Sequence, residues 1–271
     1  MIRLNHRRKL AIASYVAPRE GNIYGKLTID ASQALAYIDH LRETTGERVT
    51  ITHLVGKALG EGLRHAPTLN ARLVGTLHLP NPDVSISFLV AIPDQEDLAK
   101  VKIADIDRKS IPEIARELGE RAEQVRAGGD PDFESGKRLL QFLPIWLIRP
   151  VAALTGLLTS GLGLSARPLG LEALPFGACV VTSVGMFGVD EGFVPPTPWA
   201  RVPVWVLVGA IREQAVVRDG QVTVRPLMHL TATIDHRFID GQQVAKLTQI
   251  VREVLENPWK LEGLESPPSG V

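Results

Sequence analysis

The chain has 271 residues, of which 45% are hydrophobic and 22% are charged, with 30 basic and 30 acidic side chains. This length fits one large domain or two small ones, and the composition is that of an ordinary globular protein. The balanced charge lacks the excess of basic residues typical of nucleic-acid-binding proteins, so we expect no nucleic-acid partner.

Cysteine usage and the N-terminus bear on the compartment. Cys179 is the single cysteine, which excludes an intrachain disulfide and a cysteine-based metal cluster, so we expect no metal. The first fifteen residues include basic side chains but no apolar core of the length that a signal peptide needs. These features predict a mature, cytoplasmic protein.

The first half of the chain alternates between strand-like and helix-like segments. Asn22 to Asp30 predicts a strand, and residues 31–43 repeat apolar side chains at helical spacing. Thr50 or Thr52 caps a second predicted helix, which Pro67 ends.

A buried strand and a third helix follow. Residues 83–93, DVSISFLVAIP, end in a continuous apolar run, as expected for a strand that is covered on both faces. Ser110 precedes the third helix, with Pro112 in its first turn and Glu113 at the spacing of a capping box.

The C-terminal third is richer in strands. Asp219 and Gly220 form a predicted hairpin turn within one of them, and a final helix runs from about Gly241 to Glu256. The predicted strands are 178–184, 202–211, 215–224 and 227–235. Together these elements predict an α/β fold with helices packed on a mixed sheet.

One apolar segment, Leu139 to Leu164, does not fit this scheme. Its only charge is Arg149, so its length and apolarity approach those of a membrane span. Helix-breaking residues divide it into short pieces: Pro144, Pro150, Gly156, Gly161 and Gly163. We weigh a span, a membrane-surface or protein-docking element, and a helical pair packed on the domain or on a neighbouring subunit, and we favour the helical pair.

A histidine stands between the last strand and the last helix, in the stretch TIDHRFIDGQQ. By itself such a histidine is more often structural than catalytic. Here, however, Asp240 is placed to cap the next helix, and Gly241 stands where a side chain would obstruct the turn, so rigid elements hold His236. A neutral imidazole is suited to take a proton from a thiol at neutral pH, which predicts acyl transfer through sulfur.

This stretch resembles a known motif. His236 to Gly241 is similar to the His-x-x-x-Asp-Gly motif of the chloramphenicol acetyltransferase superfamily. With Asp235 it resembles the DHRxxDG form of the dihydrolipoamide acyltransferases, the core subunits of 2-oxoacid dehydrogenase complexes. The blocks VVTSVGMFG and VPVWVLVGAI also resemble that family, and the similarity extends from about Arg7 to Trp259, outside the apolar segment.

The resemblance implies a fold and a domain organisation. It implies a chloramphenicol-acetyltransferase-like two-layer sandwich, in which a mixed sheet carries helices on one face. The whole chain, 1–271, is then a single catalytic domain with an apolar insert at about 133–170. No lipoyl or peripheral-subunit-binding domain is recognised, so we expect a free-standing form.

The resemblance also assigns roles to residues. His236 is the general base on the thiol of coenzyme A or dihydrolipoamide, and Thr182 aligns with the serine whose hydroxyl stabilises the oxyanion. Ser183 is the alternative donor, because successive strand residues face opposite ways and only one hydroxyl points into the site. Gly185 belongs to a turn beside the acyl site.

Asp240 belongs to the expected catalytic set in a supporting role. We expect it to hold the loop through a basic residue such as Arg7 or Arg8 rather than to transfer protons. The other conspicuous histidines, His53, His65 and His229, we interpret as structural.

The implied substrates are acyl-coenzyme A and a lipoyl group supplied in trans by a lipoyl-carrying protein. The implied assembly is a homotrimer, and the solvated tail rich in proline and serine predicts no larger core. Two alternatives remain, a free-standing acyltransferase with a small-molecule acceptor and a non-catalytic scaffold subunit. In this family a glycine normally stands in the segment that reads IPDQEDL here, which leaves the shape of the substrate channel open.

Overall fold

The computed structural model describes residues 21–92, 97–127, 144–166, 170–239 and 241–264. Its first half begins with a strand and two helices and ends with a third long helix. In chain order these elements are β1 (Asn22–Asp30), α2 (Ser32–Thr45), α3 (Ile51–Arg64), β2 (Ala71–Val74), β3 (Leu77–Pro80), β4 (Ile86–Ile92), β5 (Asp97–Ile103) and α4 (Ile111–Arg126).

The second half contains the longest strands. Its elements are α6 (Ile145–Gly156), the π-helical turn η1 (Leu157–Gly161), β6 (Cys179–Ser183), the 3-10 turn η3 (Gly185–Phe187), β7 (Val204–Arg218), β8 (Gln221–Asp235), α7 (Gly241–Glu256) and the 3-10 turn η4 (Pro258–Glu262).

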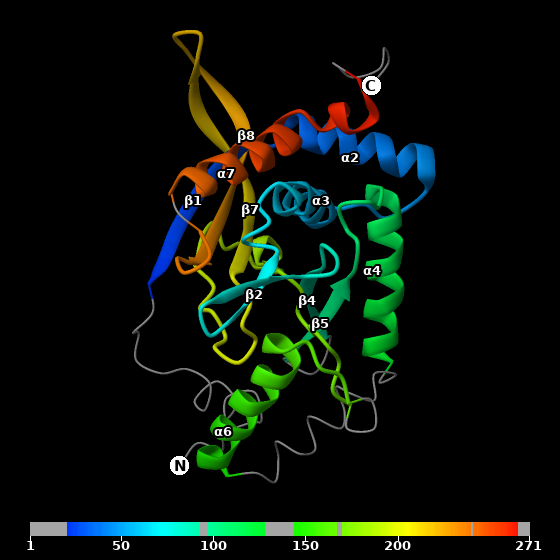
Figure 1. Ribbon diagram of the computed structural model, residues 1–271. Coiled ribbons are helices and arrows are strands. Elements are labelled where there is room, and N and C mark those ends of the chain that lie inside the picture. The colour runs from blue at the N-terminus through cyan, green and yellow to red at the C-terminus, as the bar shows by residue number, and fades with distance from the viewer. Residues whose placement is uncertain (1–20, 93–96, 128–143, 167–169, 240, 265–271) are drawn as a thin grey trace, which may run out of the picture.

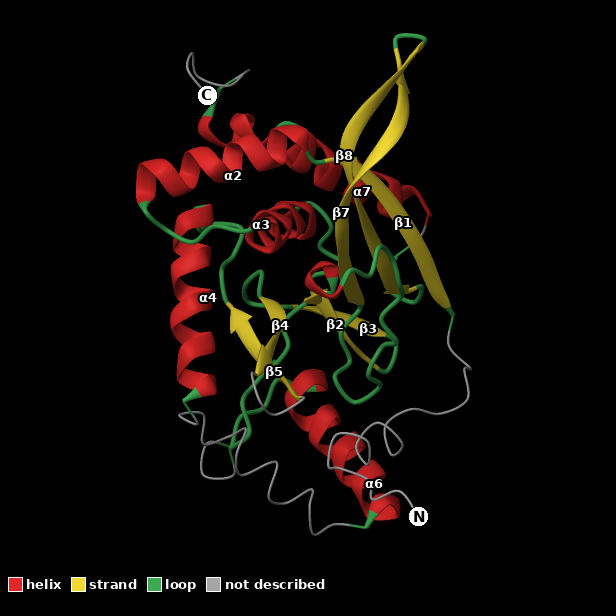
Figure 2. Ribbon diagram, turned by 180° about the vertical axis from the view of Figure 1, so that it is seen from behind, coloured by secondary structure: helices red, strands yellow, loops and turns green. Residues whose placement is uncertain are grey.

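A six-stranded mixed sheet organises the structure, in the order β1-β8-β7-β6-β4-β5. β6 pairs in parallel with both β4 and β7, and the remaining neighbours pair antiparallel. Helices α2, α3, α4 and α7 pack on one face (Figures 1 and 2). The expected two-layer sandwich is therefore confirmed.

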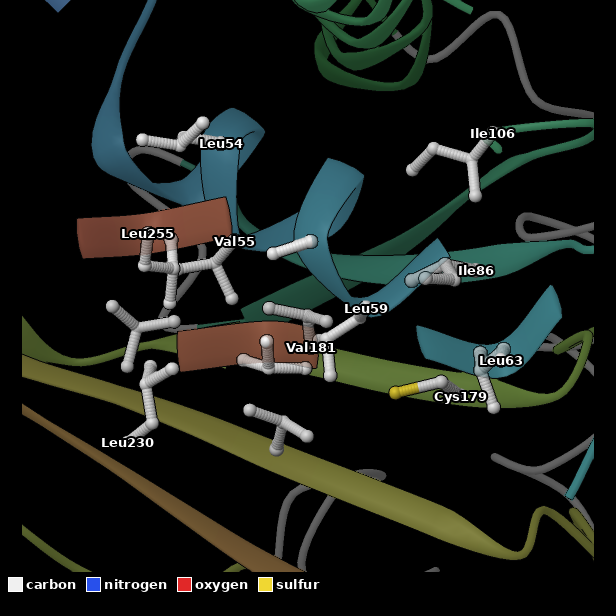
Figure 3. Close-up of a cluster of buried hydrophobic side chains, with 14 of the residues drawn as sticks. Leu54, Val55, Leu59, Leu63, Ile86, Ile106, Cys179, Val181, Leu230 and Leu255 are labelled. Atoms are coloured by element: carbon white, nitrogen blue, oxygen red, sulfur yellow. The ribbon is translucent and has the colours of Figure 1, made fainter. Parts of the chain in front are cut away.

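Helix α3 lies at the centre of the core, against the sheet and beside α7. Its side chains Val55, Leu59 and Leu63 point toward Val181 and Cys179 of β6, as Figure 3 shows. Ten of the fourteen residues of α3 are buried, as expected for a helix that its neighbours cover on most sides.

Glycine lets α3 approach the sheet closely. A Cβ on Gly56 would lie 2.5 Å from the ring of Phe88 on β4, a distance that real contacts do not reach. Phe88 is itself buried, so its ring has little room to move aside. By contrast, a Cβ on Gly119, exposed within α4, would meet nothing within 4 Å.

The capping signals of the sequence are largely confirmed. Ser110 and Glu113 form the expected capping box of α4, and Thr50 rather than Thr52 caps α3. His53 serves as the second member of the α3 capping box, because its Nδ1 accepts from the backbone N–H of Thr50 at 3.1 Å. Burial, together with the charge of Arg42, lowers the pKa of His53 to about 4, so the imidazole is neutral there.

Two features of the sheet differ from the sequence prediction. The segments 202–211, 215–224 and 227–235 are not separate strands, because they form two continuous fifteen-residue strands, β7 and β8. The predicted turn is correct, since Asp219 and Gly220 both have positive φ at the hairpin tip. The short strands β2 and β3 and the polar edge strand β5 were not predicted, because short or charged strands carry a weak pattern.

The apolar segment is described only in part. Its described part is one α-helix, α6, that runs on into the π-helical turn η1. Residues 139–143 lie outside the described residues. Among the residues that the structure covers, no helix is both long and apolar enough to cross a membrane.

The two glycines make opposite predictions for stability. Gly56→Ala forces a methyl group into the Phe88 ring, and we expect it to lower the free energy of unfolding by about 1–3 kcal/mol. Gly119→Ala adds helix propensity in open space, and we expect a gain of about 0.5–1 kcal/mol. Urea unfolding followed by circular dichroism measures both. Equal effects of the two substitutions would contradict the proposed close approach of α3 to β4.

Candidate active site

His236 lies in a tight turn directly after β8. The backbone N–H of Phe238 donates to the carbonyl of Asp235 at 3.1 Å, and the backbone N–H of His236 donates to the carbonyl of Gly21 at 2.9 Å. The side chains of Phe238 and Ile239 are buried in the core, whereas His236 is exposed. Two apolar anchors thus hold the turn and leave the imidazole accessible.

The imidazole of His236 has a defined tautomer. Its Nδ1 lies 2.6 Å from the carbonyl oxygen of Ile239. A carbonyl only accepts, so Nδ1 carries the proton and donates it. In the neutral imidazole, Nε2 then carries the free lone pair, and that atom is able to take a proton from a substrate.

Asp235 and His78 support the turn from its two sides. The carboxylate of Asp235 accepts from the backbone N–H of Arg237 at 3.0 Å and from its guanidinium. Nε2 of His78, on β3, donates to the carbonyl of Arg237 at 3.1 Å, and its ring centroid lies 5.2 Å from that of Phe238. Sequence reasoning missed His78, because no local pattern links residues this far apart in the chain.

The other histidines noted in the sequence are hydrogen-bonded, as a structural role requires. His229 Nδ1 lies 3.2 Å from the hydroxyl of Thr28, and His65 Nδ1 lies 2.9 Å from the carbonyl of Glu61. Cys179 is fully buried, and this burial raises the pKa of its thiol far above the ordinary value. The Cys179 thiol is therefore unsuited to act as an acyl carrier.

Thr182 and Ser183 point to opposite faces of the sheet. Cys179 and Val181 belong to the helix-covered core, whereas Val180 belongs to a smaller cluster on the other face, with Trp205 and Ala200. Because side chains alternate along a strand, Thr182 shares the helix-free face with Val180, and Ser183 shares the helix face. The two candidate hydroxyls are thus distinguished by the direction in which they face.

The turn after β6 is fixed by close backbone contact. A Cβ on Gly185 would lie 2.8 Å from the carbonyl oxygen of Gly209, at an irregularity in the pairing of β7. The backbone N–H of Ala210 donates to Val189 O at 2.9 Å, and Arg212 donates to the Asp190 carboxylate at the same distance. Gly185 is therefore required for the turn, as the sequence indicated.

Within one chain, Thr182 and His236 lie far apart. Thr182 pairs with Leu207 of β7, which pairs with Thr231 of β8, five residues before His236. Two strand spacings across the sheet, at right angles to five residues along the strand, place the backbones of Thr182 and His236 about 19 Å apart. The chain thus holds the two groups two strands apart and well beyond hydrogen-bonding distance.

Two further expectations concern the start of α7. Asp240, Arg7 and Arg8 lie outside the described residues. Gly241 does not play the expected steric role, because a Cβ there would meet nothing within 4 Å among the described residues and its φ is not positive. The observed turn therefore does not require glycine at position 241.

Curated proteins with similar sequences are acyltransferase components of dehydrogenase complexes. The chain is 34% identical over 233 residues to the probable mitochondrial dihydrolipoyllysine-residue succinyltransferase component of the 2-oxoglutarate dehydrogenase complex of Schizosaccharomyces pombe, covering 83% of this chain and 41% of that protein. It is 25% identical over 227 residues to the corresponding component of Bartonella vinsonii subsp. berkhoffii, covering 83% and 44%. The chain thus spans less than half the length of these relatives.

Solved structures show the same fold. A probable dihydrolipoamide acetyltransferase from Listeria monocytogenes 4b F2365 matches with a TM-score of 0.70 and 22% identity, over 98% of each chain. The dihydrolipoamide acetyltransferase of Azotobacter vinelandii matches with a TM-score of 0.65 and 19% identity, over 95% of this chain and 88% of that one.

A protein-family model matches most of the chain. The model for the 2-oxoacid dehydrogenases acyltransferase (catalytic domain) matches residues 20–130 and 165–262, and it leaves 131–164 unmatched. The matched residues include the His236 turn, the β6 hydroxyls and the whole six-stranded sheet. The chain therefore belongs to the 2-oxoacid dehydrogenase acyltransferase family, as a catalytic domain.

Proposed function

We propose that this protein transfers an acyl group between coenzyme A and a thiol acceptor, with His236 as the general base. The observation that carries the proposal is the hydrogen bond from His236 Nδ1 to the carbonyl of Ile239. In the neutral imidazole, this bond puts the single ring proton on Nδ1, so Nε2 carries the lone pair, on a side chain that is exposed at the end of the turn. A base needs this state before it can accept a thiol proton.

The proposed reaction has two steps. Nε2 of His236 takes the proton from the acceptor thiol, and the thiolate attacks the thioester carbonyl of the acyl donor. The tetrahedral oxyanion accepts a hydrogen bond from the hydroxyl of Thr182. The intermediate then expels the thiolate of the donor, which recovers the proton from the imidazolium.

The family supports a lipoyl-linked acceptor. The two curated relatives are named as dihydrolipoyllysine-residue succinyltransferases, and the Azotobacter protein has been studied for the roles of a serine, a histidine and an asparagine in its mechanism. We propose dihydrolipoamide as the acceptor, supplied in trans by a lipoyl-carrying protein. Thr182 supplies the hydroxyl. Compared with a serine, its methyl group restricts the rotamers available to that hydroxyl.

The distance between Thr182 and His236 supports a site between subunits. In a ring of identical chains, His236 of one subunit meets Thr182 of the next, and each interface then contains one complete site. We propose that the ring is a homotrimer. Thr182 is partly exposed on the helix-free face of the sheet, where such a neighbour would reach it.

The first test follows thiol release from acetyl-coenzyme A or succinyl-coenzyme A in the presence of free dihydrolipoamide. We expect turnover by the unmodified protein, and we expect His236→Ala to lower it at least a hundredfold, because a general base contributes about 10²–10⁴ in rate. His65→Ala, an exposed histidine distant from the motif, is the matched control and should leave turnover unchanged. A folded, assembled protein without activity on either donor would instead support the scaffold alternative.

The second test distinguishes the two hydroxyls of β6. Thr182→Val keeps the shape of the side chain but removes the hydroxyl, and we expect turnover to fall about tenfold to a thousandfold. Ser183→Ala should change turnover less than about twofold, because Ser183 faces the helices. The opposite ranking would assign the oxyanion donor to Ser183.

The third test asks whether the site is shared between subunits. Chains carrying His236→Ala and chains carrying Thr182→Val are coexpressed in equal amounts. Random assembly gives about a quarter of the interfaces both intact groups, so about a quarter of the unmodified activity should return. Light scattering should give a mass near three times 29.5 kDa. Coassembled chains without recovered activity would place the complete site within one subunit.

A further inference from the structure

Helix α6 is anchored to the protein along one side. Ile148 is buried, and a Cβ on Gly156 would lie 2.0 Å from the carbonyl oxygen of Trp199, so the helix packs directly against that backbone. Beyond the helix, the backbone N–H of Leu174 donates to Thr159 O at 3.2 Å. These contacts fix the direction in which the other side of α6 faces.

The opposite side of α6 exposes a row of apolar side chains. Trp146 is 74% exposed and Leu154 is 58% exposed, and Pro150 and Leu157 continue the row at intervals of three and four residues. Residues at these intervals share one face of a helix. We call Trp146, Pro150, Leu154 and Leu157 the α6 stripe. The helix lies at one end of the molecule, opposite the tip of the β7–β8 hairpin (Figures 1 and 2).

The family fold does not account for the α6 stripe. The family model matches the sequence on both sides but not residues 131–164, so α6 is an addition to the shared catalytic domain. A subunit contact common to the family would be built from shared residues. The partner that covers the stripe is therefore not a second copy of the chain assembled as in the rest of the family.

The charge around α6 favours an anionic partner. Arg149 is exposed beside the stripe, and the sequence from Ser135 to Leu171 contains no aspartate or glutamate, although the whole chain has as many acidic as basic residues. The side chains of the stripe offer one hydrogen-bonding group, the indole N–H of Trp146. Protein interfaces normally supply several hydrogen bonds across such a patch, whereas the acyl region of a lipid needs none.

The polar groups also lie at one end of the helix. Trp146 and Arg149 are in its first turns, and the leucines follow. Tryptophan and arginine are suited to the lipid headgroup region, with their apolar parts turned inward. The twelve residues of α6 span about 18 Å, less than the roughly 30 Å of a bilayer core, so the helix would lie on the surface.

We propose that the α6 stripe binds the surface of an anionic lipid membrane. The apolar side chains enter the boundary between headgroups and acyl chains, and Arg149 contacts the anionic headgroups. This proposal is independent of acyl transfer, because its test needs no substrate.

The test uses the full chain and vesicles of phosphatidylcholine with or without 30% phosphatidylglycerol, a composition chosen for the assay. We expect the chain to float with the anionic vesicles and more weakly with the neutral ones. Tryptophan emission should shift to shorter wavelength on binding, because Trp205 and Trp259 are already buried and Trp146 is the most exposed of the four tryptophans. Trp146→Phe should remove this shift and retain most of the binding.

A matched pair of double variants locates the contact. Leu154→Ser with Leu157→Ser should lower binding to anionic vesicles at least tenfold. Val217→Ser with Val222→Ser removes two valines that are each 72% exposed on the β7–β8 hairpin, and it should leave binding unchanged. Arg149→Gln should weaken anionic binding about fivefold, which corresponds to about 1 kcal/mol per basic residue at a membrane surface.

Two outcomes would overturn the proposal. The first is that the unmodified chain binds neither vesicle, and the second is equal loss of binding in the two double variants. If the first is found together with a change of mass in light scattering for Leu154→Ser with Leu157→Ser, the stripe is assigned to a contact between copies of the chain. Circular dichroism and the thermal midpoint of each variant establish that the fold is retained.

Discussion

The pairing of β6 with a neighbour on each side is the constraint on which the site depends. A strand that forms hydrogen bonds to β4 and β7 cannot rotate about its axis, so each side chain is committed to one face. Val181 enters the core beneath α3, and Thr182 consequently faces away from the helices. The direction of a proposed catalytic hydroxyl is thus a consequence of core packing.

The same sheet separates the two proposed catalytic groups. Hydrogen bonding fixes the register of β6, β7 and β8, which places Thr182 and His236 about 19 Å apart. Twisting or bending a paired sheet does not bring groups this far apart into hydrogen-bonding distance. The proposed site therefore combines the two groups from two chains, which would link the proposed catalysis to the concentration of the assembled form.

The turn that contains His236 is held in place by contacts with other parts of the structure. Its two apolar side chains, Phe238 and Ile239, are buried in the core, and its polar contacts come from Gly21 before β1 and from His78 on β3. The imidazole thus depends on segments that are distant in the chain. Helix α6 lies outside this arrangement, in a part of the chain that the family model does not match. The proposed membrane binding through α6 and the proposed chemistry at His236 therefore depend on separate parts of the chain.

The sequence by itself determined the features that depend on short-range patterns. These include the strand Asn22–Asp30, the capping box at Ser110, the turn at Asp219 and Gly220, and the motif around His236. Only the tertiary structure decided that β7 and β8 are continuous, that His78 supports the turn, and that Thr182 rather than Ser183 faces away from the helices. The physical reason is the distance along the chain between the residues that interact. Caps, turns and motifs are satisfied by neighbours within a few residues, whereas sheet register, side-chain facing and subunit geometry depend on contacts between segments far apart in the sequence.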